Sequence, residues 1–281
     1  LRGVPIHISQ SCEIWGTTAT ELYPNAILGS VWYRRYRPVG RRIKLLLRDM
    51  EEIVSPASKL VGEVLVPGER APAERALVLA ALGGEKSAIS NVPVAAERVV
   101  DLLRGLGVGI DKRKSVYGVK GVGLRGFDGV DEPVDLDGLG DTALLLLTVL
   151  AGQSFTSRVK LGEEVERCQP LIELLLKLGF EIQRETESAF AVGGGEPAGH
   201  VFEEVDIAAE LKLGVMVGAL YAAGVTRLTD TASNRNRMER FLRSRGVEVE
   251  RRKEGTGYMV SVAGGQAVGA LDMEVPVTLH H

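Results

Sequence analysis

Apolar residues follow two alternating patterns after residue 60, and together they predict alternating strands and helices. Short apolar runs indicate strands at 61–66, 88–92, 108–110 and 115–119. Residues 94–106 place Val99, Leu102, Leu103 and Leu106 on one face, the spacing of an amphipathic helix. Further runs are apolar on nearly every side, which predicts helices buried in the core at 73–82, 143–150 and 213–220.

This arrangement occurs three times at nearly equal steps. The glycines that end the second helix of each copy are 72 and 67 residues apart (Gly107, Gly179, Gly246). The glycines that follow the first helix are 68 and 72 residues apart (Gly84, Gly152, Gly224). Two offset series with similar steps indicate an internal repeat. The sequence therefore predicts an α/β fold of three βαβαββ repeats about a pseudo-threefold axis with buried central helices, at about 60–128, 129–199 and 200–272.

Charge divides the chain. Residues 1–49 carry eight Lys or Arg and three Asp or Glu, a net charge of +5. Since the whole chain has a net charge of −3, the remaining residues carry −8. We predict a basic and aromatic N-terminal extension over 1–58, poorly structured, then the lobe of three repeats over 59–276 and a tail over 277–281. The extension is a solvated tail, or translated sequence upstream of a natural start at Met50, or an arm that binds nucleic acid through phosphate pairing and stacking.

Several classes of protein are excluded by what the sequence lacks. No apolar run reaches the roughly eighteen residues that span a membrane, and the N-terminus lacks the layout of a signal peptide. We therefore expect a soluble, cytoplasmic protein. Cys12 and Cys168 lie far apart without metal-ligand spacing, and the four histidines show none either. No metal and no cofactor are predicted.

Five segments, in order along the chain, resemble the consecutive motifs of one enzyme family. They are 62–77, 137–143, 162–170, 206–210 and 233–240, and the family is 5-enolpyruvylshikimate-3-phosphate (EPSP) synthase, the enolpyruvyl transferase of the shikimate pathway. The match covers about 60 to 276, which is one of the family's two lobes, the one that mainly holds shikimate 3-phosphate. The resemblance implies phosphoenolpyruvate and shikimate 3-phosphate as ligands. It also implies that the family begins its crossing into the second lobe near 274–276, where this chain nearly stops.

The resemblance also implies a set of binding positions, most of which are substituted here. Arg70 stands where the family has its lysine, Ala71 where it has a phosphate-binding serine, and Asp141 where its glycine approaches phosphoenolpyruvate. Gln169 stands at the arginine that precedes proline. The family's Ser-Ser-Gln phosphate cradle is replaced by Ala208, Ala209 and Glu210, whereas Arg75 and Ser233 are retained.

These substitutions predict weak ligand binding. Arginine stays protonated, so Arg70 can hold a phosphate but cannot act as a base, and a carboxylate at Asp141 repels a bound phosphate. Each lost charge-assisted contact costs about 1.5–3 kcal/mol. No catalytic residue is assigned. A structural role stays open for three of the polar residues: Arg75 as a surface or capping partner, and Thr142 and Ser233 as helix N-terminal residues that satisfy backbone groups.

Three hypotheses follow. The chain is an EPSP synthase-like lobe that is weak or inactive alone, or half of a working transferase completed by a partner chain or a C-terminal lobe. A third hypothesis is a non-catalytic module that binds nucleic acid or acidic protein through its arginine-rich segments, 34–42 and 235–245, although the second of these is typical of a solvated helix face.

Overall fold

The structure is a computed structural model that describes residues 6–7, 51–52, 66–202, 207–231 and 237–277. The chain divides into two units, residues 1–64 and 65–281. In the first unit, the described residues form one antiparallel pair, β1 (Ile6–His7) and β2 (Glu51–Glu52). The rest of the basic extension, predicted to end at residue 58, lies outside the described residues. Its boundary and character therefore stay predictions.

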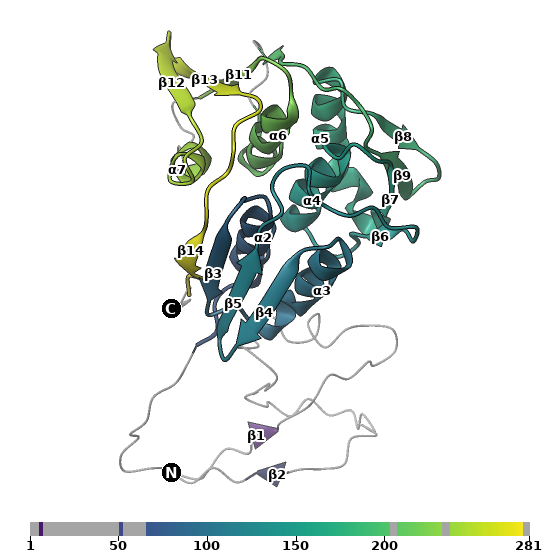
Figure 1. Cartoon of the computed structure of the whole chain (residues 1–281), viewed down its shortest axis with the longest axis vertical. Helices are drawn as coiled ribbons and strands as arrows, with labels where there is room; N and C mark the ends of the chain where they lie inside the picture. The colour runs from purple at the N-terminus through teal and green to yellow at the C-terminus, as the bar shows by residue number, and fades with distance from the viewer. Residues whose placement is uncertain (1–5, 8–50, 53–65, 203–206, 232–236, 278–281) are drawn as a thin grey trace, which may run out of the picture. The chain divides into compact units, whose positions relative to one another are not determined.

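The second unit is a mixed α/β lobe (Figure 1), and the α-helices of its described residues fall into pairs along the chain. The first helices of the pairs are α2 (Arg70–Ala81), α4 (Asp141–Ala151) and α6 (Ala209–Tyr221). The second helices are α3 (Glu97–Gly105), α5 (Val165–Lys177) and α7 (Arg237–Arg243). Single 3₁₀ turns, η1 (Val94–Ala96) and η2 (Gly162–Glu164), precede α3 and α5. The predicted helices are confirmed, with ends displaced by a few residues.

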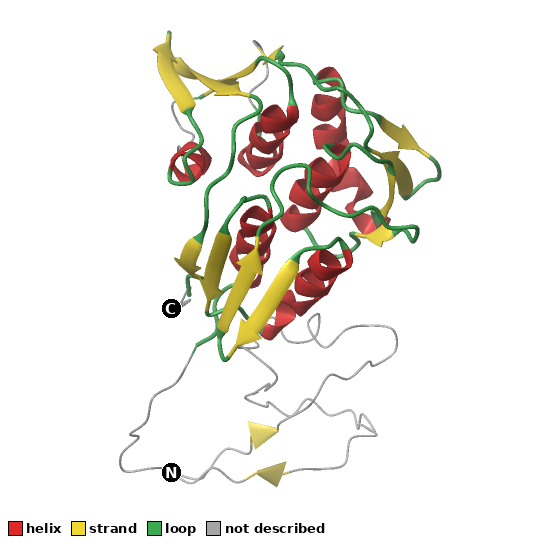
Figure 2. Ribbon diagram, viewed as in Figure 1, coloured by secondary structure: helices red, strands yellow, loops and turns green. Residues whose placement is uncertain are grey.

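The three first helices form the core, as their all-round apolar sequences predict. Every residue of α4 after Asp141 is buried, and α6 is buried from Leu211 to its last residue. Helix α4 packs against both α2 and α6. Figure 2 shows the helices of this unit with the sheets lying outside them. Because these helices have no polar face, they are stable only when their neighbours surround them.

Three four-stranded sheets share one strand order, with a short parallel edge strand beside an antiparallel set. The first sheet is β14 (Asp272–Glu274), β3 (Lys86–Ser90), β5 (Val116–Lys120) and β4 (Gly109–Arg113). The second is β6 (Val134–Asp135), β7 (Ser157–Lys160), β9 (Ala189–Val192) and β8 (Ile182–Arg184). The third is β10 (Val201–Phe202), β11 (Val225–Asp230), β13 (Gly257–Ala263) and β12 (Val249–Glu254).

The repeated order supports the three-unit organisation, with one difference from the prediction. The edge strand of the first sheet is β14, from the far end of the lobe, whose Asp272 pairs in parallel with Ala88. Of the strand predicted at 61–66, only Val66 is described, and it lies outside any strand. The expected left-handed turns are present, because Gly107, Gly179 and Gly246 all have positive φ, from 77° to 86°. The pseudo-threefold axis stays a prediction.

The C-terminal ends of the three central helices meet at the segment 122–125. The Val122 amide donates to the Ala81 carbonyl at the end of α2, over 2.9 Å. The Arg125 guanidinium donates to the carbonyls of Gly152 and Tyr221, at the ends of α4 and α6, over 3.1 and 3.3 Å. A cation suits this place because helix C-terminal carbonyls carry partial negative charge. The three helices therefore run in parallel, and their N-terminal ends lie toward the opposite side.

A buried group of four charged side chains joins α6 and α7 to the third sheet. Lys212 of α6 lies 2.9 Å from Asp230 of β11 and 2.7 Å from Glu239 of α7. Arg251 of β12 pairs with the same two carboxylates and stacks on the Tyr258 ring. Lys212, Asp230 and Glu239 are at most 3% exposed. Two cations balance two anions, so the group is stable only when complete.

Within the described ranges, no helix has the length and apolar character needed to cross a membrane.

We predict that Lys212→Met destabilises the lobe by about 3–5 kcal/mol, because two buried carboxylates then lose one of the two cations that they share. Urea unfolding followed by circular dichroism measures the change. Lys177→Met is the matched control, since Lys177 ends α5 with an exposed side chain and methionine is a good helix former. Equal, small losses in both variants would contradict the prediction.

Candidate functional site

The N-terminal ends of α2 and α4 are joined by hydrogen bonds that involve the predicted site residue Arg70. Its Nε donates to Glu74 Oε1 over 2.6 Å, and its guanidinium also donates to the Gly138 carbonyl over 3.1 Å. The other Glu74 oxygen accepts from the Thr142 hydroxyl over 2.9 Å. Glu74 is only 1% exposed. Arg70 is therefore committed to a buried carboxylate of its own helix and to the loop before α4.

Asp141, the first residue of α4, lies between arginines from two other helices. Its Oδ1 is 3.0 Å from Arg167 of α5, and its Oδ2 is 3.9 Å from Arg75 of α2. Arg167 also donates to Glu164 Oε2 over 3.0 Å, and the other Glu164 oxygen accepts from the Gly140 amide over 3.0 Å. The carboxylate at the predicted phosphoenolpyruvate position is thus engaged by two cations.

These six side chains form what we call the paired-charge cluster. Its cations are Arg70, Arg75 and Arg167, and its anions are Glu74, Asp141 and Glu164. Three positive charges minus three negative charges leave zero. Since an anion site needs cations in excess of their own counter-ions, this arrangement has little attraction for a phosphorylated ligand.

The loop between β6 and α4 is held by hydrogen bonds to α3 and to η2. Arg98 of α3 donates to the carbonyls of Asp135 and Asp137, and Asp137 Oδ1 accepts from the Glu163 amide over 2.9 Å. Gly138 and Gly140 have φ of 68° and 55°, a conformation that side chains disfavour. This rigid loop presents Asp141 at a fixed position.

The other predicted positions do not join this cluster. Gln169 donates to Glu173 one turn along its own helix, over 3.2 Å, and Ala71 is exposed at the start of α2. Ala208 precedes α6 without a side-chain cap, and Glu210 is exposed in the first turn. Ala209 begins α6, and its side chain and the whole of Ser233 lie outside the described residues. The substrate-binding roles of all these positions stay untested.

Sequence reasoning missed half of the cluster. Glu74 and Glu164 sit in motif segments but were not singled out, and Arg167 lies two residues before the lost arginine position at Gln169. The role expected for Thr142 was wrong, because its hydroxyl bonds to the Glu74 carboxylate across the helix pair rather than to backbone. A charged residue inside an apolar helix, such as Glu74, is the signal that could have revealed the contact.

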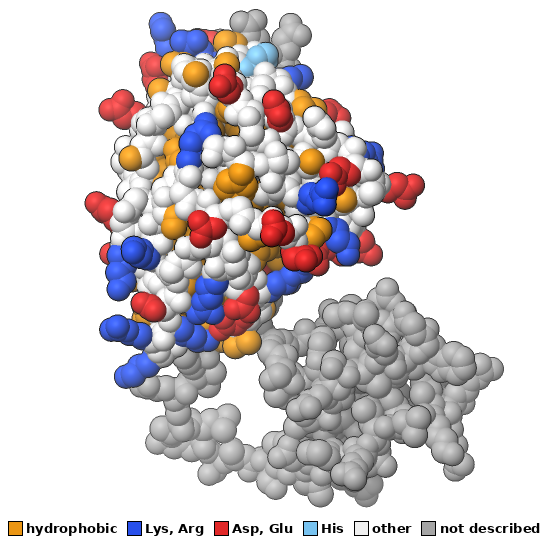
Figure 3. Space-filling view, turned by 45° about the vertical axis from the view of Figure 1, so that its right-hand side comes forward, with side chains coloured by type: hydrophobic (Ala, Val, Ile, Leu, Met, Phe, Trp, Pro, Cys, Tyr) orange, Lys and Arg blue, Asp and Glu red, His pale blue; other side chains and the backbone are white. Residues whose placement is uncertain are grey.

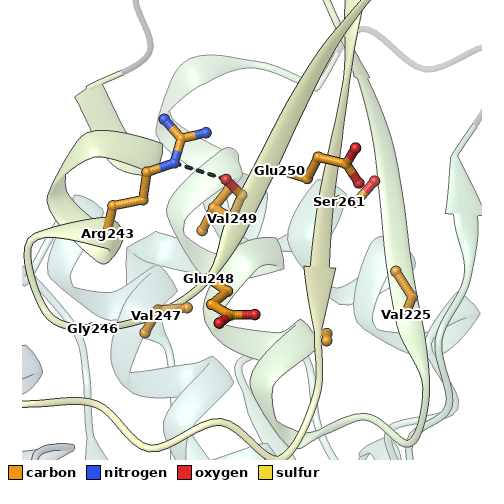
Figure 4. Close-up of a pocket in the computed structure, with 9 residues that line it drawn as sticks. Val225, Arg243, Gly246, Val247, Glu248, Val249, Glu250 and Ser261 are labelled. Atoms are coloured by element: carbon orange, nitrogen blue, oxygen red, sulfur yellow. Dashed lines mark hydrogen bonds between the residues drawn. The ribbon is translucent and has the colours of Figure 1, made fainter.

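A groove among the described residues lies elsewhere and contains none of the predicted site residues. It has a volume of about 590 Å³ and is lined by α7, β11, β12, β13 and the turn after α7. Figure 4 shows Arg243 turned to the Val249 carbonyl, to which its Nε donates over 2.7 Å. The remaining charged side chains of the groove are the carboxylates of Glu248 and Glu250. The groove therefore does not suit an anionic ligand.

No metal centre or reactive thiol accompanies the site in the part of the chain that the structure describes. That part contains no group of three His, Cys, Asp or Glu that could hold a metal ion. Cys168 of α5 is fully buried, and burial raises the pKa of its thiol to about 12. Since the thiolate is the reactive form, Cys168 acts as a packing residue.

The fold defines the class of protein first. The lobe superposes on EPSP synthase from Acinetobacter baumannii with a TM-score of 0.65 and 24% identity, over 76% of this chain and 49% of that one. It also superposes on the enolpyruvyl transferase NikO from Streptomyces tendae, with a TM-score of 0.58 and 16% identity, over 77% of this chain and 52% of that one. The fold is that of an enolpyruvyl transferase lobe.

The sequence then gives the family. Residues 54–277 match the family described as EPSP synthase (3-phosphoshikimate 1-carboxyvinyltransferase), and the chain belongs to it. Proteins named 3-phosphoshikimate 1-carboxyvinyltransferase are 27% identical in Persephonella marina, over 81% of this chain and 54% of theirs. The protein of the same name from Alkalilimnicola ehrlichii is 32% identical, over 82% of this chain and 52% of its own length. The chain thus spans about half the length of the curated relatives it matches, and the resemblance inferred from the motifs is confirmed.

We predict that Glu74→Ala destabilises the lobe by about 2–3 kcal/mol, because Arg70 loses its carboxylate partner and the buried Thr142 hydroxyl loses its acceptor. Urea unfolding measures the loss. Glu166→Ala, at an exposed position of α5, removes the same group and should change stability by no more than about 0.5 kcal/mol. If both variants were equally stable, the α2–α4 link would contribute nothing.

Proposed function

We propose that this lobe is an EPSP synthase-type lobe which, by itself, binds shikimate 3-phosphate and phosphoenolpyruvate weakly and has little or no transferase activity. Family membership supports the choice of ligands. The paired-charge cluster supports the weak affinity, and it is the observation that carries the proposal.

Enolpyruvyl transfer makes strong electrostatic demands. Two phosphorylated and carboxylated molecules must be held together while a carbon is protonated, a hydroxyl adds to its neighbour and phosphate leaves. Such a site requires fixed cations that are free to pair with ligand oxygens, and a group that exchanges a proton near neutral pH. Arg70 cannot be that group, since a guanidinium stays protonated.

The contacts of the arginines explain why affinity should be low. A phosphate on Arg70 would have to share that guanidinium with the buried Glu74 carboxylate or displace it, leaving the carboxylate without its counter-ion. A phosphate on Arg167 would compete in the same way with Asp141 and Glu164. Breaking a charge-assisted hydrogen bond costs about 1.5–3 kcal/mol, so each new ligand contact gains little over the contact it replaces.

A second candidate is half of a working transferase, completed by a further lobe or a partner chain. The match over residues 54–277 and the coverage of about half of each relative favour it. Under this hypothesis, the additional part supplies the free cations and the proton-exchanging group. The paired-charge cluster then has a structural role, which is to fix the loop before α4.

The nucleic-acid hypothesis gains less support. Arg237 and Arg240 of α7 are exposed, but Arg243 donates to Val249, and Arg245 is 3% exposed and donates to the Gly269 carbonyl. The 235–245 run is therefore only partly a solvated face. On the face drawn in Figure 3, basic and acidic side chains are interspersed rather than gathered into a basic patch. The 34–42 segment lies outside the described residues.

We predict that millimolar shikimate 3-phosphate, alone or with phosphoenolpyruvate, leaves the thermal unfolding midpoint unchanged beyond the effect of sulfate at equal ionic strength. A ligand at one hundred times its Kd would add about 2.7 kcal/mol of stability, a shift of several degrees. The full-length Acinetobacter baumannii EPSP synthase is the positive control. A specific rise in the midpoint would show that this lobe binds the ligands by itself and would overturn the proposal.

A further inference from the structure

Two arginines converge on one protein carboxylate at the edge of the lobe. Arg75 comes from the second turn of α2, Arg167 from the first turn of α5, and Asp141 from the start of α4. All three side chains are partly exposed, between 32% and 49%. A group that replaced the Asp141 carboxylate would therefore face two guanidiniums and remain open to solvent.

The geometry around Asp141 is that of a bound anion. Arg167 approaches one carboxylate oxygen to 3.0 Å while Arg75 stands 3.9 Å from the other, an ion-pair distance that is longer than a hydrogen bond. The carboxylate also lies in the first turn of the eleven-residue α4, where a negative charge is favourable. Two cations and a helix end thus surround a single negatively charged group.

An incoming anion meets two obstacles at this place. The Asp141 carboxylate is tethered, so it competes at an effective concentration of at least the millimolar range. It also repels the anion, because two like charges a few ångströms apart at a protein surface raise each other's energy, and salt screens part of this repulsion. Both obstacles disappear when the carboxylate is removed.

We propose that Asp141 is a specificity-determining residue: an internal counter-ion that takes the place of a ligand's anionic group between Arg75 and Arg167 and so excludes anions from this lobe. The inference rests on the proposed function, because it gives the physical cause of the weak affinity. With Asp141 present, the charges of Arg75, Arg167, Asp141 and Glu164 sum to zero, +2 minus 2. Without the Asp141 charge they sum to +1.

The place between Arg75 and Arg167, once the Asp141 charge is removed, would take one phosphate or carboxylate group. Guanidinium pairs bind the oxygens of such groups through parallel hydrogen bonds. Arg70 is not one of the two cations that flank Asp141, and its charge is paired with the buried Glu74 carboxylate. The site is therefore suited to a single anionic group and not to both phosphorylated ligands together.

The test is the affinity for inorganic phosphate and for phosphoenolpyruvate, measured by titration calorimetry on the full chain. Asp141→Asn keeps the size of the side chain and removes its charge, and Asp141→Ala removes the group altogether. Asp101→Asn is the matched control, because it changes the net charge equally at an exposed position of α3. The variant Asp141→Asn/Arg167→Gln removes one of the two cations again.

We expect both Asp141 variants to bind phosphate and phosphoenolpyruvate at least about tenfold more tightly than the unmodified protein, a change of 1.4 kcal/mol. Asp101→Asn should leave the affinity unchanged, and Arg167→Gln should cancel the gain. The inference is overturned if neither Asp141 variant gains affinity, if Asp101→Asn gains as much, or if the gain survives Arg167→Gln.

These outcomes are separate from those of the proposed function. If the unmodified protein binds shikimate 3-phosphate tightly, the proposed function fails, whatever the Asp141 variants do. If the unmodified protein and the Asp141 variants are equally inert, the proposed function stands and the counter-ion role of Asp141 falls. Circular dichroism confirms that each variant is folded, and the use of two Asp141 substitutions guards against the failure of one.

Discussion

The packing of α4 between α2 and α6 is the constraint on which the rest of the lobe depends. Beyond their first turns these helices are apolar on nearly every side, so they must be enclosed, and segment 122–125 fixes their C-terminal ends together. Their parallel direction then determines which side chains can meet at the opposite ends. At these ends Glu74 of α2 meets Thr142 of α4, and Arg75 of α2 meets Asp141 of α4. The site is a consequence of the core.

The two ends of the three central helices carry side chains of opposite charge. At the C-terminal ends, the single cation Arg125 satisfies carbonyls that would otherwise be buried without partners. At the N-terminal ends, where helix dipoles favour an anion, the chain supplies its own carboxylate, Asp141. Our proposals combine these two features: a helix end that suits an anion, and a carboxylate of the chain itself that occupies it. This reconciles a clear family match with a poor set of ligand contacts.

Much of the fold could be predicted from sequence, because all-round apolar runs and left-handed glycines such as Gly107 are local signals. The closing strand β14 could not, since its pairing with β3 joins residues 184 positions apart, as Asp272 and Ala88 show. At the site, the motif pattern identified Arg70 and Asp141 as altered positions. The partner Glu74 lies four residues after Arg70 on the same helix, a spacing that the sequence does contain. Arg167 was missed because charge pairing across helices depends on distances that a single sequence does not contain. The Lys212 group was missed for the same reason.

The central claim is that the arginines of the paired-charge cluster are already engaged by the protein's own carboxylates. Nuclear magnetic resonance of the arginine Nε–H groups, assigned by single Arg→Lys variants, tests it directly. The account predicts that the signals of Arg70 and Arg167 exchange slowly with solvent in the unliganded protein and do not shift when millimolar phosphoenolpyruvate and shikimate 3-phosphate are added. Saturable shifts of either signal at micromolar ligand would show that these cations are free to bind, and would contradict the account.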